Sequence, residues 1–427
     1  MELDISHENS LVDVAPVLHL HELGPHTEVV VRIDVTDAAG ATWRSANLYR
    51  ADSRGTVRTD RDAPLSGTYE GVDATGPWWS MECRPAPGRP ATAFTAPDSA
   101  LTWSVECVAQ NATARLRRDV VRRWRADPVS KAEEQLDGMR LLRFALPSDT
   151  SAGRPVVVVV PGTTGSEAVS PAAALLASRT GFDTVVLDYQ AASDPPALRE
   201  VPLERLASGI DAAARGLPSA VVAYSVGTGG ALAALALTAT PVRAAVAIAP
   251  THVIWQALAN SGRPPQTSAW SYQSTPMAYA PIRGELLLPQ LAYHALANRF
   301  RSRAVRSTAL RLKPAYVAGL RRVPPDAVIP VERIAAPLMA IAGTDDAMWP
   351  SEHMARALID RRRSAAVPEA DVLMICPKAG HFLRPPYIPT TVDRNADLVA
   401  GGVPAATAKA QEESWGALCA FLQRHLH

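Results

Sequence analysis

The stretch that decides the fold is Val221-Val222-Ala223-Tyr224-Ser225-Val226-Gly227-Thr228-Gly229-Gly230-Ala231-Leu232, VVAYSVGTGGAL. An apolar run ends at Ser225, and a segment rich in alanine and leucine begins directly after it. Ala223 and Gly227 complete the pattern small-x-Ser-x-small, which is typical of a nucleophile elbow between a strand and a helix. Small residues are needed there because such a tight turn brings backbones into contact. We therefore predict that Ser225 projects its hydroxyl from the tip of a buried strand.

The segments around this stretch alternate between apolar runs and helical patterns. Runs that are apolar on both faces are typical of a parallel sheet covered by helices, and they occur at 155–160, 184–187, 220–223, 244–248 and 338–341. Helical patterns follow at 170–179, 202–214 and 229–237, and an amphipathic helix over 415–426 closes the chain. The repeated order predicts a doubly wound, mostly parallel α/β domain over 128–427. This placement favours the elbow over the alternative, a strand-end serine that caps the next helix.

The first part of the chain has the period of half-buried strands. Apolar and polar residues alternate over 29–35 and 101–107, and further strands are expected at 42–50 and 112–121. Turn residues separate these segments, as in a β-sandwich. We expect this sandwich to span 1–127. In the second part, the alternation stops between Pro250 and Pro337, which predicts a cap insertion of about 251–336 over the site.

Composition excludes several classes of function. The chain has 427 residues and a formal net charge of +1, which gives no case for nucleic-acid binding. We expect no membrane span, because no apolar run reaches the length that a bilayer requires. The N-terminus is polar and acidic, and the four cysteines are sparse, so we expect a cytoplasmic protein with reduced thiols and no metal site. Arginine far outnumbers lysine, which we interpret as the mark of a GC-rich, bacterial genome.

A serine hydroxyl needs a base to act as a nucleophile. In an elbow-type α/β fold the acid and the histidine follow the serine, each after a later strand. Asp345 and Asp346 follow the apolar run at 338–342, and His381 follows another at 372–376. The sequence therefore predicts a triad of Ser225, one of these two aspartates, and His381. The alternatives are a carboxylate pair that caps the helix near Ser351 and a histidine satisfied in the core.

Two backbone N–H groups are expected to stabilise an oxyanion beside Ser225. Val226 would supply one from the N-terminus of the next helix. Thr163 or Thr164, in the glycine-containing loop Pro161–Ser166, would supply the other; the alternative is a plain glycine turn. Neither a metal nor a cofactor is needed for this chemistry. The residues predicted to contact substrate are Tyr224, His252 and Trp349.

The second half of the predicted cap looks helical over 286–322 and is strongly basic. It carries Arg299, Arg301, Arg303, Arg306, Arg311, Lys313, Arg321 and Arg322. These residues form either solvated helix faces or a basic rim for phosphate groups of a substrate or carrier. In the sandwich, Tyr69, Trp78 and Trp79 either shape the entrance to a pocket or pack in the core.

With these residues in hand, the chain resembles the family of acyl-CoA thioesterases and bile acid-CoA:amino acid N-acyltransferases. The resemblance extends over nearly the whole length. It lies in 43–52, 67–72 and 76–81 near the N-terminus, and in Gly343-Thr344-Asp345-Asp346, Gly380-His381 with Pro385-Pro386-Tyr387, and the closing helix. It implies an immunoglobulin-like sandwich ahead of an α/β-hydrolase domain, and it selects Asp346 as the acid of the triad.

The resemblance implies an acyl-enzyme mechanism on CoA thioesters. The family's amino-acid-conjugating members look to use cysteine as nucleophile, so a serine favours hydrolysis. We therefore expect a thioesterase that hydrolyses acyl-CoA or acyl groups bound to an acyl-carrier protein. The alternatives are an acyltransferase or cyclase of specialised metabolism, which passes the acyl group to an amine or hydroxyl, and a catalytically silent binding protein.

Overall fold

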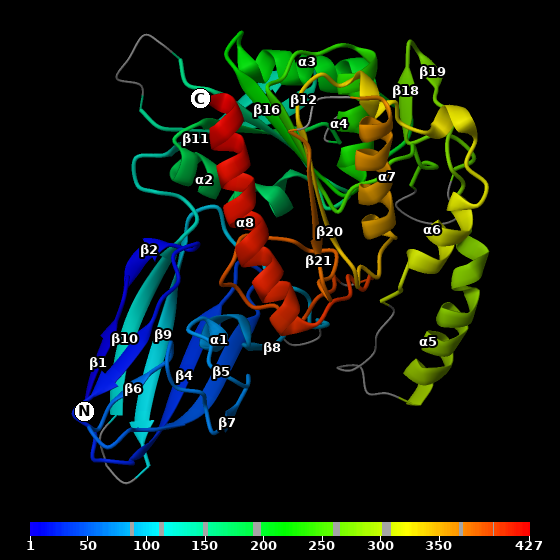
Figure 1. The fold of residues 1–427 in the computed structure, drawn as a ribbon. Coiled ribbons are helices and arrows are strands. Elements are labelled where there is room, and N and C mark those ends of the chain that lie inside the picture. The colour runs from blue at the N-terminus through cyan, green and yellow to red at the C-terminus, as the bar shows by residue number, and fades with distance from the viewer. Residues whose placement is uncertain are drawn as a thin grey trace.

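The computed structural model describes residues 1–85, 89–110, 115–147, 153–190, 198–258, 265–300, 309–366, 370–395 and 397–427. A β-rich N-terminal part lies below a larger α/β part in Figure 1, and the last helix runs from one to the other. Among the described residues, no helix combines the length and the apolar character needed to cross a membrane. The cytoplasmic location and the bacterial origin stay predictions.

The N-terminal part is built from two sheets that share one core. Six strands follow the order β2-β10-β9-β4-β5-β7 with β8 beside β5, and the second sheet has the order β1-β3-β6. Alternate residues of β4, among them Val29 and Val31, are fully buried, as the predicted period of two requires. The elements are β1 (Glu2–Ile5), β2 (Asn9–Leu11), β3 (Leu18–His21), β4 (Glu28–Thr36), β5 (Thr42–Arg50), β6 (Val57–Arg58), β7 (Ser66–Gly67), α1 (Gly76–Trp79), β8 (Glu82–Arg84), β9 (Ala100–Ala109) and β10 (Arg115–Arg123).

The expected sandwich strands are therefore present; of the strand expected at 112–121, residues 112–114 lie outside the described part of the chain. The immunoglobulin-like class stays a prediction. Sheet membership changes between Arg123, which ends β10, and Ser130, which begins β11. The predicted boundary at 127/128 lies within this interval and stays a prediction.

The α/β part contains one eight-stranded sheet with the order β11-β12-β14-β13-β16-β17-β20-β21. All neighbours from β14 to β21 are parallel, whereas β11 and β12 pair antiparallel at one edge. This confirms the predicted α/β-hydrolase fold; the leading hairpin of β11 and β12 was not foreseen. The strands are β11 (Ser130–Leu136), β12 (Met139–Ala145), β13 (Val156–Val160), β14 (Asp183–Asp188), β16 (Ser219–Tyr224), β17 (Ala244–Ile248), β20 (Leu338–Gly343) and β21 (Val372–Cys376).

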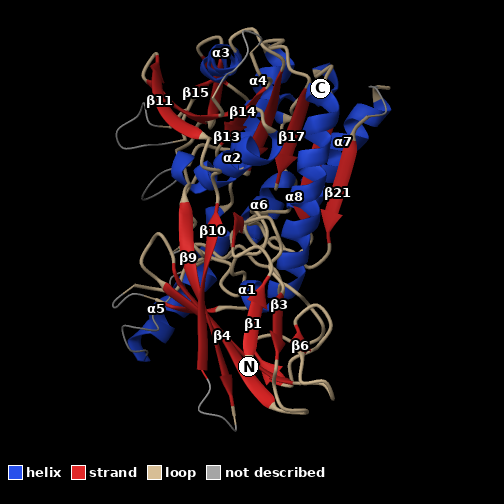
Figure 2. Cartoon of the chain, turned by 90° about the vertical axis from the view of Figure 1, so that its left-hand side faces the viewer, coloured by secondary structure: helices blue, strands red, loops and turns tan. Residues whose placement is uncertain are grey.

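Helices cover both faces of this sheet, as Figure 2 shows. Alternate residues of the buried strands divide between two cores: one contains α2 and α8, and the other contains α3, α4 and α7. The helices are α2 (Ser166–Thr180), α3 (Leu203–Ala214), α4 (Val226–Leu237), α7 (Ser351–Ser364) and α8 (Pro404–Leu426). The core that contains α8 also includes the sandwich residues, so the two parts share a continuous apolar interior.

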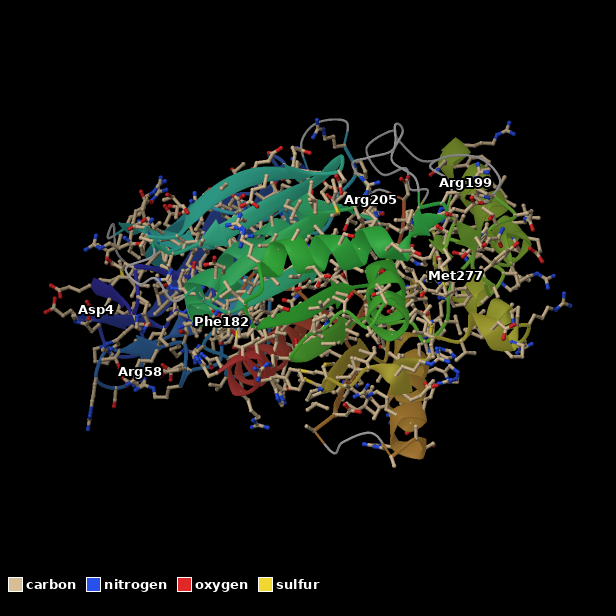
Figure 3. All side chains as sticks on the ribbon, turned by 90° about the horizontal axis from the view of Figure 1, so that it is seen from above. Asp4, Arg58, Phe182, Arg199, Arg205 and Met277 are labelled. Carbon is tan, nitrogen blue, oxygen red and sulfur yellow. The ribbon has the colours of Figure 1, made fainter. Side chains whose placement is uncertain are left out.

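The segment 251–336 forms an insertion between β17 and β20. It contributes β18 and β19 to a small sheet with β15, and its described residues also form short 3-10 helices and the α-helices α5 and α6. Figure 3 shows this region at the end of the molecule near Met277, opposite Asp4 and Arg58 of the sandwich. Its elements and their partner strand are β15 (Val201–Pro202), β18 (Trp270–Tyr272), β19 (Thr275–Pro276), η1 (Gly284–Leu287), α5 (Leu288–Phe300), α6 (Lys313–Leu320), η3 (Pro325–Ala327) and η4 (Val331–Arg333).

Asp13 ties the sandwich to two helices of the α/β part. Its side chain is only 2% exposed, and it accepts hydrogen bonds from Arg179 Nε at 2.8 Å and Nη2 at 2.7 Å, at the end of α2. Trp415 Nε1 of α8 donates to Asp13 Oδ2 at 2.9 Å. A buried carboxylate with three donors orients both helices against the sandwich.

We predict that Asp13→Ala lowers the free energy of unfolding by roughly 2–4 kcal/mol, because it leaves a buried indole N–H and a guanidinium without their acceptor. Urea unfolding followed by fluorescence measures the change. Asp127→Ala is the matched control: Asp127 also pairs with an arginine, Arg123, but its side chain is 81% exposed. An equally small effect of both changes would show that the Asp13 contacts do not hold the two parts together.

Candidate active site

Ser225 occupies a strained turn between β16 and α4. Its φ of 51° and ψ of −128° lie outside the regions that a residue with a side chain usually adopts. The Ser225 N–H donates to the Ile248 carbonyl at 2.9 Å, which fixes the turn to the neighbouring strand β17. A Cβ on Gly227 would lie 2.2 Å from the Pro161 carbonyl oxygen, so only glycine fits there. The predicted need for small residues around the elbow therefore has a steric cause in the structure.

The three predicted triad side chains form one hydrogen-bonded chain. His381 Nε2 lies 2.9 Å from Ser225 Oγ, and His381 Nδ1 lies 2.7 Å from Asp346 Oδ2. The other carboxylate oxygen, Asp346 Oδ1, accepts from the backbone N–H groups of Met348 at 2.8 Å and Trp349 at 3.2 Å. Asp346 is 1% exposed and His381 is 6% exposed. Asp345, the other aspartate that the sequence offered as the acid, takes no part in these hydrogen bonds.

Local backbone contacts bring Asp346 and His381 together. The Ala400 carbonyl accepts both from Ala347 N at 2.9 Å and from His381 N at 3.1 Å, so one carbonyl joins the two loops. The Trp349 ring packs edge-on against the imidazole, with 5.8 Å between the ring centroids. These contacts fix the orientation of the imidazole before any substrate binds.

A further buried carboxyl, that of Asp393, lies behind the histidine. Its Oδ2 is enclosed without a hydrogen-bond partner among the described residues, and it lies 2.2 Å from where a Cβ on Gly380 would be. Burial raises the pKa of Asp393 to about 7, and the charges of Arg384 and His381 only partly oppose this effect. The motif search did not point to Asp393, because no sequence pattern marks its approach to the site.

The loop that follows β13 lies directly beside Ser225. A Cβ on Gly162 would be 3.0 Å from the Ser225 Cβ. Two side chains that follow β14 bind the carbonyls of this loop: Tyr189 Oη donates to Pro161 O at 3.0 Å, and Gln190 Nε2 donates to Gly162 O at 3.1 Å. The exposed Thr163 and Thr164 follow at the cavity wall. Val226 is the first residue of α4, so its N–H has no acceptor within the helix.

Ser225 and His381 open into a cavity of about 320 Å³ between the sandwich and the α/β part. Its wall includes sandwich residues 92–96 and Trp124, residues of α2 such as Ala168 and Ala172, and the segment 381–385 with Ile388. Apolar wall residues such as Phe94, Trp124 and Ile388 were not predicted, because they lie far apart along the chain and belong to no motif. Tyr224 also lines the cavity, and its contact with substrate stays a prediction.

Other predicted contacts lie elsewhere. No described residue of 251–336 is among those that line the cavity, and the role of this insertion as a cap stays a prediction. His252 packs against His353, with ring centroids 5.8 Å apart, and burial together with His353 lowers its pKa to about 4. Trp349 contacts His381 and not the cavity. In the sandwich, Tyr69, Trp78 and Trp79 pack in the core, as the alternative interpretation held.

Two family models match this chain. The model described as "Acyl-CoA thioester hydrolase/BAAT N-terminal region" matches residues 14–135, and the model described as "BAAT / Acyl-CoA thioester hydrolase C terminal" matches residues 219–427. The two models describe the two regions of one family, and together they match more than half of the chain. The chain therefore belongs to the acyl-CoA thioester hydrolase/BAAT family. With Ser225, His381 and Asp346 in hydrogen-bonded order, it is an acyl-CoA thioesterase-like hydrolase.

The chain is similar to several curated proteins over nearly its whole length. Acyl-coenzyme A thioesterase 6 of Homo sapiens is 24% identical, and the match covers 95% of this chain and 92% of the human protein. Acyl-coenzyme A thioesterase 3 of Mus musculus is 27% identical over 95% of this chain and 89% of its own length. A solved monoglyceride lipase variant from Saccharomyces cerevisiae is 13% identical with a TM-score of 0.38, covering 70% of this chain and 96% of the lipase chain. The fold assignment rests on the strand order itself.

We predict that Asp393 causes the free energy of unfolding to decrease as the pH rises. Its raised pKa means that the folded protein keeps a proton that the unfolded chain releases near pH 4. The free energy of unfolding should therefore decrease between about pH 4 and pH 7, by on the order of 1 kcal/mol per pH unit from this group. Urea unfolding at several pH values should show a flatter profile for Asp393→Asn than for the wild type. Asp397→Asn, a carboxyl-to-amide change on the same loop, is the control, and an unchanged slope in Asp393→Asn would contradict the prediction.

Proposed function

We propose that this chain hydrolyses acyl thioesters through an acyl ester on Ser225. The observation that carries the proposal is the pair of distances at His381, 2.9 Å to Ser225 Oγ and 2.7 Å to Asp346 Oδ2. An imidazole held by a buried carboxylate on one nitrogen can accept a proton on the other. This arrangement opens into a cavity large enough for an acyl chain, which a merely structural serine would not require.

The reaction proceeds in two steps. Ser225 Oγ attacks the thioester carbonyl while its proton passes to His381 Nε2, and Asp346 stabilises the imidazolium through Nδ1. The tetrahedral oxyanion collapses, the C–S bond breaks, and His381 returns the proton to the leaving thiolate. Water then attacks the acyl-Ser225 ester with His381 as base, and the acid leaves as Ser225 recovers its proton.

The oxyanion would be stabilised by the N–H groups of Val226 and of Thr163 or Thr164. Val226 presents its N–H at the N-terminus of α4, where the helix dipole favours negative charge. Because the Gly162 carbonyl is engaged by Gln190, the N–H of the same peptide, that of Thr163, points the opposite way. Each such donor contributes on the order of 3 kcal/mol to the stabilisation of the transition state.

The acyl chain would occupy the cavity between the two parts of the chain. Its walls are largely apolar, with Phe94, Trp124 and Ile388 among the lining residues, as a hydrocarbon chain requires. Relatives that carry the name acyl-coenzyme A thioesterase support a CoA thioester as substrate. A carrier-bound acyl group presents the same reacting thioester, so we propose it as a second class of substrate for this site.

We predict that Ser225→Ala abolishes formation of the acyl-enzyme and lowers turnover by on the order of 10⁴-fold or more. Intact-mass spectrometry after brief mixing with a panel of acyl-CoA thioesters should show an acyl adduct only when Ser225 is present. The same serine should react with a fluorophosphonate. Ser364→Ala is the matched control, because Ser364 is an exposed serine of α7 whose hydroxyl donates to the Asp360 carbonyl within the same helix.

Unchanged turnover or labelling in Ser225→Ala would overturn the proposed mechanism. The nature of the products separates hydrolysis from acyl transfer. Release of the free acid in the presence of candidate amines and alcohols supports the proposal, whereas an amide, ester or cyclised product identifies an acyltransferase.

A further inference from the structure

Helix α5 has an inverted distribution of polar and apolar residues. Gln290, His294 and Asn298 follow one another at intervals of four, so they form one stripe along the helix. This stripe is half-buried and faces the protein: Gln290 exchanges two hydrogen bonds with the Arg311 backbone, at 2.9 and 3.0 Å, and His294 Nδ1 is enclosed. The large apolar side chains of the helix therefore point outward. A helix that stabilises its own fold has the opposite arrangement.

The outward face concentrates most of the exposed large apolar side chains of the described chain. Exposure reaches 61% for Leu296 and 84% for Phe300. We call this set the α5 face; it comprises Leu286 of the preceding η1 together with Leu288, Leu291, Tyr293, Leu296 and Phe300 of α5. Figure 1 shows α5 at the outer edge of the molecule, where no other labelled element covers it. An apolar patch of this kind on a protein surface marks an interaction site.

The sequence around the α5 face is strongly basic. From Leu286 to Pro325 there are eight arginine and lysine residues and no aspartate or glutamate, whereas the whole chain has a net charge of only +1. Arg299, Arg311, Arg321 and Arg322 are exposed, and none of them forms an ion pair with another described residue. The predicted basic residues Arg301, Arg303 and Arg306 lie outside the described residues and enter this count from the sequence alone.

The inward polar stripe of α5 is connected to the wall of the cavity by a short series of hydrogen bonds. Arg311, which bonds Gln290, follows Leu310, and Leu310 pairs with the 397–399 segment through Leu310 N to Asp397 O at 2.7 Å and Val399 N to Leu310 O at 2.9 Å. Asn395, which lines the cavity, accepts from Leu398 N at 2.7 Å. The backbone that holds α5 in place is therefore linked through a few hydrogen bonds to a residue of the cavity wall.

We propose that the α5 face docks an acidic protein that presents the acyl thioester on a flexible arm, the chemistry of an acyl-carrier protein. Exposed apolar side chains supply the centre of such an interface, and the unpaired arginines attract the acidic surface and orient it. A second copy of this chain fits less well, because a two-fold contact would bring the two basic segments against each other. A membrane surface fits less well. A helix that lies in a membrane interface carries its cations on the polar side that faces the solvent. The polar side of α5, formed by Gln290, His294 and Asn298, carries no arginine or lysine and faces the protein.

This proposal rests on the proposed thioesterase function for its biological sense, but binding can be tested without turnover. The experiment titrates a fluorescently labelled, acidic holo-acyl-carrier protein with Ser225→Ala protein and follows anisotropy. Leu296→Gln/Phe300→Gln should weaken binding about tenfold or more, since truncating central apolar contacts of an interface has effects of this size. Arg299→Glu/Arg321→Glu should weaken binding similarly and flatten its dependence on salt. Leu65→Gln/Val72→Gln, which alters exposed apolar residues of the sandwich, is the control and should bind like the parent.

Kinetics on the Ser225 enzyme separate the two proposals. With the same acyl group carried by the carrier protein or by CoA, the α5 variants should lose kcat/KM for the carrier-bound thioester and keep it for acyl-CoA.

Equal binding of the carrier protein by all variants overturns the docking proposal, and so does an equal loss of kcat/KM on both substrates. Loss of binding to anionic vesicles, or a change from dimer to monomer in sedimentation, with carrier binding unchanged, overturns it in favour of a membrane or a second copy. Absence of turnover on either thioester, with binding as expected, contradicts the thioesterase function alone.

Discussion

The whole site depends on the backbone of Ser225, which is held at a φ of 51° between β16 and α4. This conformation costs on the order of 1–3 kcal/mol for a residue with a side chain, so the surroundings must enforce it. The Ile248 carbonyl binds the Ser225 N–H, and the approach of Pro161 to Gly227 leaves no room for the turn to relax. The result places the Oγ within reach of His381 and the first N–H of α4 beside it, without any rearrangement.

The cavity depends on a second constraint, the docking of the sandwich on the segment that follows His381. Arg384 Nη1 donates to the Phe94 carbonyl at 2.9 Å, and the Ala93 N–H donates to the Arg394 carbonyl at 2.7 Å. These bonds connect the sandwich wall of the cavity to the loop that carries the base. The sandwich is also joined to α2 and α8 through Asp13, which accepts hydrogen bonds from Arg179 and Trp415. Neither part alone encloses the cavity, which explains why the sandwich accompanies the α/β part although it contributes no reacting group.

The sequence predicted the elements whose signal is local. The apolar runs at β13, β16 and β17 and the small residues around Ser225 carry their information within a few positions. The order of the strands pointed to His381 and to the pair Asp345 and Asp346, and the family resemblance selected Asp346, which is the aspartate that contacts His381. The walls of the cavity could not be predicted in this way. Phe94, Trp124 and Ile388 meet only because the sandwich docks on the α/β part, and an apolar residue carries no mark of which cavity it will line.

The hairpin of β11 and β12 was missed because β11, SKAEEQL, is an exposed edge strand with charged residues and little alternation. The insertion between β17 and β20 was predicted as a lid from its length alone, and this role stays a prediction.

The polarity of α5 has no explanation within the fold. Burying a single leucine or phenylalanine side chain contributes about 1.5–3 kcal/mol, and α5 leaves several of them in water. A helix of 13 residues has only marginal stability by itself, so the formation of α5 contributes little to the stability of the fold. The inward stripe of Gln290 and His294 shows that α5 is not rotated by chance, because the hydrogen bonds of Gln290 to Arg311 fix which side faces the protein. Since this orientation does not serve the stability of the chain, the apolar side that it presents is best explained by a surface outside the chain.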